Sequence, residues 1–160
     1  MKRKININYI LAACAVVLAL LCFLSIRKPM AFEAEQTSRE TVVKEQLMHI
    51  RMAEEKFKQK HGAYTSNFDL LIKEGYLDKE SQFIPFSNHK KFSLSASTQV
   101  SKSGKQIPLM ECSALYEDYL VGLDSHEIDQ LTQQANASGQ FPGLKIGDIT
   151  ENSNNVGNWQ

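Results

Sequence analysis

The 160-residue sequence has no net charge, because 18 lysine and arginine side chains balance 18 aspartate and glutamate side chains. Domains that bind nucleic acid carry a basic excess, so this balance gives no reason to expect a nucleic-acid partner. Glycine and proline are also scarce, at eight and four residues, which excludes a collagen-like or linker-like chain. The length allows one modest domain with a hydrophobic core of its own.

Cysteine is equally scarce. Cys14 and Cys22 lie in an apolar run, and Cys112 is alone outside it. This usage excludes a disulfide framework and a CxxC metal or redox pair. We expect Cys112 to be a buried, inert thiol, with an intermolecular bridge or a reactive site as the alternative. His126, the histidine nearest to Cys112 in sequence, gives no geometric support for a Cys–His nucleophile.

Motifs for common catalytic and metal chemistry are missing. There is no Walker A, GxGxxG or HExxH motif, and the four histidines are scattered: His49, His61, His89 and His126. We therefore expect no catalytic residue, no cofactor and no metal site. Four oxygen-bearing side chains within seven residues favour turns and leave calcium binding as an alternative: Asp148, Glu151, Asn152 and Asn154.

One long uncharged run stands near the N-terminus. Residues 9–26 (YILAACAVVLALLCFLSI) would extend about 27 Å as a helix, close to the thickness of a bilayer core. All charges before residue 31 are basic: Lys2, Arg3, Lys4, Arg27 and Lys28. The rest of the chain has 13 bases against 18 acids. The positive-inside tendency then predicts a cytoplasmic segment 1–8, a transmembrane helix 9–28 that contacts the lipid bilayer, and a periplasmic domain 29–160.

Two processing events compete with an uncleaved inner-membrane anchor. Residues 11–14 (LAAC) have the form of a lipobox, but the apolar run continues for twelve residues beyond Cys14. Residues 29–31 (PMA) make a poor signal-peptidase site, and the run is longer than the usual signal-peptide core. An uncleaved single-pass anchor is the favoured interpretation.

An amphipathic helix is predicted over residues 32–60, after Pro29 ends or kinks the membrane helix. Its apolar stripe is formed by Val43, Leu47, Ile50 and Phe57. We expect this stripe to pack on the protein's own sheet, and a coiled coil between protomers is the alternative. The candidate partner interface comprises this stripe and the single tryptophan: Val43, Leu47, Ile50, Phe57 and Trp159.

Trp159 itself has two interpretations. It docks into a groove and orders the tail, or it stays free for recognition by a partner. The area that an indole buries favours docking.

The remaining sequence predicts short elements after a stop at Gly62. They are a helix 69–74 capped by Ser66 or Asn67, an extended segment 83–86, strands 92–100, 107–112 and 115–123, a helix 126–137 capped by Ser125, and a strand 144–146. The strands form an antiparallel meander, and the tail is irregular. The predicted fold class is α+β: an N-terminal transmembrane helix, then a long amphipathic helix packed on a small antiparallel sheet.

The segment 46–64 (QLMHIRMAEEKFKQKHGAY), followed by LL at 70–71 and GYL at 75–77, resembles the post-helix region of type IV pilins and type II secretion pseudopilins. Residues 83–85 (FIP) stand where those proteins often have an extended Ile-Pro stretch. The resemblance covers roughly residues 9–100 and implies an apolar helix, an amphipathic helix and an antiparallel sheet. No prepilin peptidase motif precedes the apolar run.

The chain as a whole resembles a group of uncharacterised single-pass envelope proteins of Bacteroidetes. The segments that carry this resemblance are 50–54 (IRMAE), 68–72 (FDLLI), 122–124 (GLD), 141–147 (FPGLKIG) and 154–159 (NNVGNW). The resemblance implies a location in the cell envelope and assigns no activity.

These observations favour a non-enzymatic inner-membrane protein that presents a pilin-like domain to the periplasm and acts as a structural or assembly component. Its expected partners are other envelope proteins or further copies of itself. The alternative is a membrane-anchored binding or sensing module that uses the sheet and a calcium-binding, Asn-rich tail. An enzyme ranks third, because no acid–base or nucleophile set is present.

Overall fold

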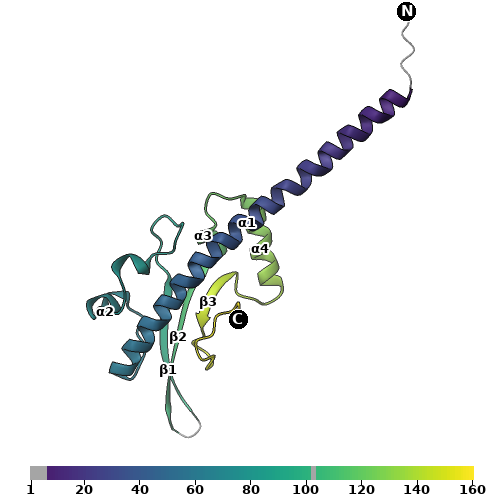
Figure 1. The fold of residues 1–160 in the computed structure, drawn as a ribbon. Helices are drawn as coiled ribbons and strands as arrows, with labels where there is room; N and C mark the ends of the chain where they lie inside the picture. The colour runs from purple at the N-terminus through teal and green to yellow at the C-terminus, as the bar shows by residue number, and fades with distance from the viewer. Residues whose placement is uncertain (1–6, 102–103) are drawn as a thin grey trace, which may run out of the picture. The chain divides into compact units, whose positions relative to one another are not determined.

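The computed structural model describes the backbone of residues 7–101 and 104–160, and side chains outside residues 7–8 and 23–29. The elements in chain order are α1 (Ile7–His61), α2 (Phe68–Lys73), a 3-10 turn (Lys79–Gln82), β1 (Ser93–Val100), β2 (Gln106–Leu115), α3 (Tyr116–Tyr119), α4 (Ser125–Ala137) and β3 (Gly143–Gly147) (Figure 1). The chain divides into two compact units, Met1–Gln36 and Thr37–Gln160. The fold is thus α+β, with a long helix and a small antiparallel sheet, as predicted.

The first unit consists of the N-terminal part of α1. Eight large apolar side chains between residues 9 and 21 are 51–73% exposed. Among the residues that the structure describes, no helix combines the length and the apolarity needed to cross a membrane. Part of the predicted span 9–28 lies outside these residues, because the side chains of 23–29 are not described, and neither are residues 1–6 of the predicted basic segment.

The helix α1 passes through Pro29 without ending, so of the two predicted effects of this proline, an end or a kink, the end is wrong. A proline inside a helix removes one backbone donor, but the hydrogen bonds of the turns on either side can form. The residues that follow are rich in alanine, glutamate and glutamine, which are strong helix formers, so the helix continues.

The second half of α1 is the predicted amphipathic helix. Val43, Leu47 and Ile50 are fully buried and Phe57 is nearly so. The helix ends where Gly62 adopts φ +79° and its N–H donates to the carbonyl of Lys58 at 2.7 Å. Glycine reaches this left-handed conformation at no steric cost, which is why the helix stops here.

The sheet has the strand order β1-β2-β3, and both pairings are antiparallel. One row of side chains crosses it at Leu94, Cys112 and Ile146. Since neighbouring residues on a strand point to opposite faces, this face is apolar and the other carries Ser95, Glu111 and their neighbours. Residues 37–61 of α1 lie across the sheet (Figure 1). The core therefore sits between α1 and the apolar face.

The prediction of a strand over 115–123 is wrong. Residues Tyr116–Tyr119 form the short helix α3, and the sheet's third strand is β3. Tyr116, Tyr119 and Leu120 are spaced three and four residues apart, which is helical spacing, and Tyr119 and Leu120 are fully buried. In an apolar segment this short, the sequence pattern fits a strand and a buried helical turn equally well.

The ends of the short helices test the predicted caps. The Asn67 side chain accepts a hydrogen bond from the N–H of Asp69, which confirms it as the cap of α2. The cap of α4 is Asp124, whose side chain accepts from the N–H of His126, so the assignment to Ser125 is wrong by one residue. Aspartate and serine are about equally good caps, and the sequence offers both in succession.

The segment before β1 departs from the predicted extended stretch 83–86. Phe83 pairs with Lys91 in an isolated antiparallel bridge, but the chain turns at Pro85 and Phe86, where Phe86 has φ +65°. Proline favours the second position of a turn, so it reverses the chain here.

The tail runs back beside β3. Gly157 pairs with Ile146, and the N–H of Asn158 donates to the carbonyl of Lys145 at 3.0 Å. The tail thereby covers the outer edge of β3, and the prediction that it is irregular misses this pairing.

Candidate functional site

A polar cluster joins the end of α1, the loop after it and the C-terminal tail. We call it the α1–tail cluster: Glu54, Glu55, Lys58, Tyr64 and Asn155. The Tyr64 hydroxyl donates to Glu55 Oε1 at 2.5 Å and accepts from Lys58 Nζ at 2.9 Å. Asn155 Nδ2 lies 2.7 Å from Glu55 Oε1 and 2.6 Å from the Tyr64 hydroxyl. Side chains up to 100 positions apart in sequence thus share one network.

The charges of this cluster depend on one another. Burial acts to raise the pKa of Glu55, but hydrogen bonds from Tyr64 and Asn155, with the charges of Lys58 and Arg51, lower it overall. Burial and the bond to Glu55 raise the pKa of Tyr64. The bond to Tyr64 raises the pKa of Lys58. The Glu55 carboxylate and the Lys58 ammonium are therefore both held in their charged forms, and the Tyr64 phenol between them is neutral.

Glu54 differs from its neighbour because its side chain is fully buried. Its Oε2 accepts from the N–H of Thr65 at 3.0 Å, and its Oε1 has no hydrogen-bond partner among the described residues. Burial raises the pKa of Glu54 to about 7, against the lowering effect of the Thr65 bond. On β2, burial first and the Glu54 charge second raise the pKa of Cys112. A buried carboxyl whose pKa is raised toward neutrality is the kind of group that gathers at functional sites.

A cavity of about 440 Å³ opens beside the cluster. Glu55, Lys58 and Tyr64 line one side, and the start of β2 and three tail asparagines line the other. These groups can hydrogen-bond a small polar molecule. Sequence reasoning missed the cluster, because the only signal was a Glu-Glu pair on a charged helix, which is an ordinary pattern for a solvated face.

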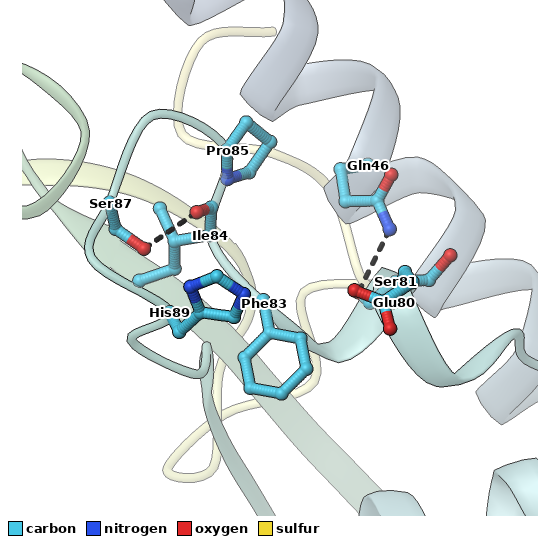
Figure 2. A pocket seen from close by; sticks show the side chains of 8 residues that line it. All are labelled: Gln46, Glu80, Ser81, Phe83, Ile84, Pro85, Ser87 and His89. Atoms are coloured by element: carbon cyan, nitrogen blue, oxygen red, sulfur yellow. Dashed lines mark hydrogen bonds between the residues drawn. The ribbon is translucent and has the colours of Figure 1, made fainter.

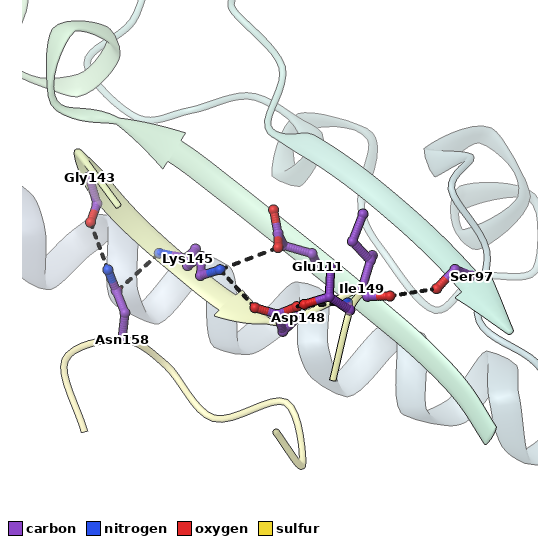
Figure 3. Close-up of polar contacts among 8 residues, drawn as sticks. Ser97, Glu111, Gly143, Lys145, Asp148, Ile149 and Asn158 are labelled. Atoms are coloured by element: carbon purple, nitrogen blue, oxygen red, sulfur yellow. Dashed lines mark hydrogen bonds and ion pairs between the residues drawn. The ribbon is translucent and has the colours of Figure 1, made fainter. Parts of the chain in front are cut away.

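The calcium alternative depends on the oxygen atoms around Asp148. Asp148 Oδ2 accepts from Lys145 Nζ at 3.1 Å (Figure 3). Asp148 Oδ1 accepts from the N–H of Thr150 at 2.7 Å. Hydrogen bonds from Thr150 and then Lys145 hold the pKa of Asp148 well below its usual range. In the described part of the chain, no three His, Cys, Asp or Glu side chains are placed to hold a metal ion.

Asn152 and Asn154 form a turn in the tail. Asn152 Oδ1 accepts from the N–H of Asn154 at 3.2 Å, and Asn154 has φ +54°. Turn formation, the favoured interpretation of these residues, is what their geometry shows.

The predicted partner residues fall into two places. The stripe of Val43, Leu47, Ile50 and Phe57 is covered by the protein's own core, as in the favoured interpretation, so it offers no exposed surface to a partner. Trp159 is half-buried at a different place, next to Tyr116 and Phe141. None of the four stripe side chains lines the cleft that holds Trp159, although Lys44 of the same helix does.

A second cavity, of about 300 Å³, lies between α1 and the segment 80–89 (Figure 2). Gln46 Nε2 donates to the carbonyl of Ser81 at 2.8 Å, and the rings of Phe83 and His89 meet edge to face with centroids 5.5 Å apart. The Ser87 hydroxyl donates to the carbonyl of Ile84 at 2.7 Å. These contacts are local, and they fix the turn that the sequence did not predict.

The cysteines and histidines lie apart. Cys112 is fully buried, as expected for an inert thiol, whereas Cys14 and Cys22 are exposed on α1. His126 is exposed and bonds Gln130 on its own helix. His61 bonds Glu74 at 2.9 Å and stacks on Phe57.

Comparisons with models of protein families, with curated proteins and with solved structures found no match to this chain. The resemblances to pilins and to the Bacteroidetes envelope group therefore stay predictions.

Proposed function

We propose that this protein is a membrane-anchored structural or assembly component of the cell envelope, with a pilin-like layout. Residues 1–8 lie in the cytoplasm, residues 9–28 cross the inner membrane, and residues 29–160 form the periplasmic domain. In this proposal the chain has no catalytic role, and its partners are envelope proteins or further copies of itself.

The observation that carries the proposal is the exposed apolar surface of the N-terminal part of α1. Tyr9, Leu11 and Leu18 are 73%, 63% and 62% exposed, and five further large apolar side chains between residues 10 and 21 are at least half exposed. A helix surface this apolar requires a lipid bilayer or other helices around it. The polar and charged domain that follows supports a role outside the bilayer.

Membrane anchoring is tested by flotation with liposomes. The full chain and a fragment of residues 37–160, which form a compact unit, are mixed with neutral phosphatidylcholine vesicles and centrifuged through a density gradient. We expect the full chain to float with the vesicles and the fragment to stay at the bottom. If the full chain also stays at the bottom of the gradient, residues 9–28 do not anchor it in a bilayer.

Assembly is tested by crosslinking in native membranes. Cys14 and Cys22 are exposed on α1, whereas Cys112 is buried. Copper phenanthroline, an oxidant that partitions into membranes, therefore joins the first two thiols to those of a neighbouring chain as disulfides and leaves Cys112 reduced. We expect a crosslinked dimer or a captured envelope protein, and its loss in the Cys14→Ser, Cys22→Ser double variant. The matched control is Cys112→Ser, which keeps both exposed thiols. Recovery of monomer alone would contradict the assembly role.

A further inference from the structure

Three aromatic side chains line a cleft of about 290 Å³ that the proposed function does not use. Tyr116 comes from α3, Phe141 from the turn before β3, and Trp159 from the tail. We call it the aromatic cleft. Its polar wall is supplied by Glu40, Lys44, Gln140, Lys145 and Asn158. Aromatic rings beside a few placed polar groups are the usual lining of a small-molecule site.

The indole of Trp159 is held in place by its surroundings. A Cβ at Gly157 would come within 2.7 Å of ring atoms of Trp159, so the ring lies directly against the glycine backbone. Lys44 Nζ lies 5.9 Å from the centre of the indole. Asn158, the residue before Trp159, donates to the carbonyl of Gly143 at 2.9 Å and accepts from the N–H of Lys145 at 3.1 Å (Figure 3). The tail thus presents its tryptophan in a fixed position.

The lysines of the cleft are neutralised by the chain itself. Lys44 pairs with Glu40 at 3.0 Å. Lys145 pairs with Asp148 at 3.1 Å and with Glu111 at 3.4 Å. A phosphate or carboxylate ligand would have to break these pairs to gain its own, so the electrostatics of the cleft favour a ligand without net charge.

The remaining groups indicate the class of this neutral ligand. The Tyr116 hydroxyl both donates and accepts, and the Gln140 amide offers two donors and an acceptor, which matches the hydroxyl groups of a sugar. The C–H face of a pyranose ring is apolar and complements the negative face of an aromatic ring. We propose that the aromatic cleft binds a neutral saccharide, with a sugar ring on Trp159 and its hydroxyl groups on Tyr116 and Gln140.

Trp159 makes the proposal directly measurable, because it is the only tryptophan in the chain. The full chain in detergent micelles is titrated with tri-N-acetylchitotriose, and separately with cellotriose, while the indole emission is recorded. We expect a saturable change in emission with a dissociation constant of about 1 mM or below for at least one of them. No change up to roughly 10 mM of either sugar would overturn the proposal.

Variants then locate the binding. Tyr116→Phe removes one hydroxyl and Gln140→Ala removes one amide, and both leave Trp159 in place. We expect each variant to weaken binding about fivefold to tenfold with an unchanged melting temperature, and the exposed α4 control Gln134→Ala to bind normally. Wild-type affinity in both cleft variants would overturn the assignment to this cleft.

An acidic sugar tests the preference of the cleft for a neutral ligand. Tri-galacturonic acid carries three carboxylates and is used at the same concentrations and ionic strength. We expect it to bind at least tenfold more weakly than the better neutral sugar. Tighter binding of the acidic sugar would overturn the assignment to a neutral ligand. None of these results depends on membrane insertion or on partner proteins, so the proposed function can fail or hold independently.

Discussion

Glu54 occupies a position that the pattern of its own helix assigns to an apolar residue. It follows Ala53 and precedes Phe57 by three positions, so it lies within the apolar stripe of α1, fully buried. One carboxylate oxygen accepts from Thr65, and the other has no partner among the described residues. Because a buried unpaired charge is costly, this carboxyl favours its protonated form.

We predict that Glu54 makes the stability of the protein fall as pH rises. Its pKa is 4.5 in a solvated chain and about 7 in the folded state. The folded state therefore binds the proton more tightly, so the contribution is present below pH 4.5 and is lost as pH rises through 7. The loss amounts to about 3 kcal/mol.

The measurement is urea unfolding of the wild type and Glu54→Gln at pH 5 and pH 8. We expect the variant to be the more stable of the two at pH 8 and to lose less stability between the two pH values. Glu45→Gln, on the exposed face of the same helix, is the control and should behave as the wild type. Parallel pH profiles for Glu54→Gln and the wild type would refute the prediction.

A second residue-scale prediction concerns Lys90 and Asp118. The Lys90 ammonium lies 2.5 Å from Asp118, whose side chain is only 9% exposed, and Asp118 raises the pKa of Lys90 through that hydrogen bond. Lys90→Ala leaves a nearly buried carboxylate without this cation, so we expect a loss of about 1–3 kcal/mol in the free energy of unfolding. Lys56→Ala, at an exposed site on α1, should change it by about 0.5 kcal/mol or less. Thermal melts measure both, and equal effects would contradict the prediction.

At the scale of elements, those with a repeating signal were predictable. The second half of α1, α4 and β1 were located within one residue at most ends, because apolar periodicity, a capping residue or a following glycine marks them. Each failure has its own physical reason. Tyr116–Tyr119 is too short to show a period, the cap of α4 is one of two adjacent capping residues, and the pairing of Gly157 with Ile146 joins segments that only the fold brings together.

The same limit applies to the candidate sites. Trp159 was singled out as a rare residue, and its partial burial agrees with a docked tail. Its neighbours in the aromatic cleft, Tyr116 and Phe141, carried no signal, because a cleft depends on contacts between distant segments. The α1–tail cluster was not predicted for the same reason, because Asn155 and Glu55 are 100 residues apart in sequence.

Two adjacent valines test the burial of α1. Val43 is fully buried and Val42 is 41% exposed. We expect Val43→Ala to lower the free energy of unfolding by about 2 kcal/mol, because it leaves a cavity under the helix. Val42→Ala should be within about 0.5 kcal/mol of the wild type, since it loses little burial and alanine is the better helix former. Chemical denaturation compares the two, and similar losses would mean that the helix does not pack on this face.

At the scale of the whole molecule, the core is confined to one of the two units. Every buried apolar side chain among the described residues lies between Val43 and Ile146. The first unit, Met1–Gln36, contributes none of them. The stability of the described fold therefore depends on the second unit, Thr37–Gln160.

We predict that residues 37–160 fold without the first unit. The fragment should unfold in one cooperative thermal transition followed by circular dichroism, because it retains the whole core and sheet. Its melting temperature should match that of the same domain in the full chain within a few degrees. A broad transition without cooperativity would show that the N-terminal segment is required for folding.

Cys112, at the centre of the sheet and beneath α1, provides a native measure of how often these two layers separate. Thiol reagents reach its sulfur only in molecules whose helix has lifted from the sheet. In the 37–160 fragment it is the sole cysteine, so its modification rate relative to a free thiol gives the equilibrium constant for opening under native conditions. Modification kinetics at one native sulfur, with no introduced cysteine, can thus compare the opening of the wild type with that of each stability variant proposed above.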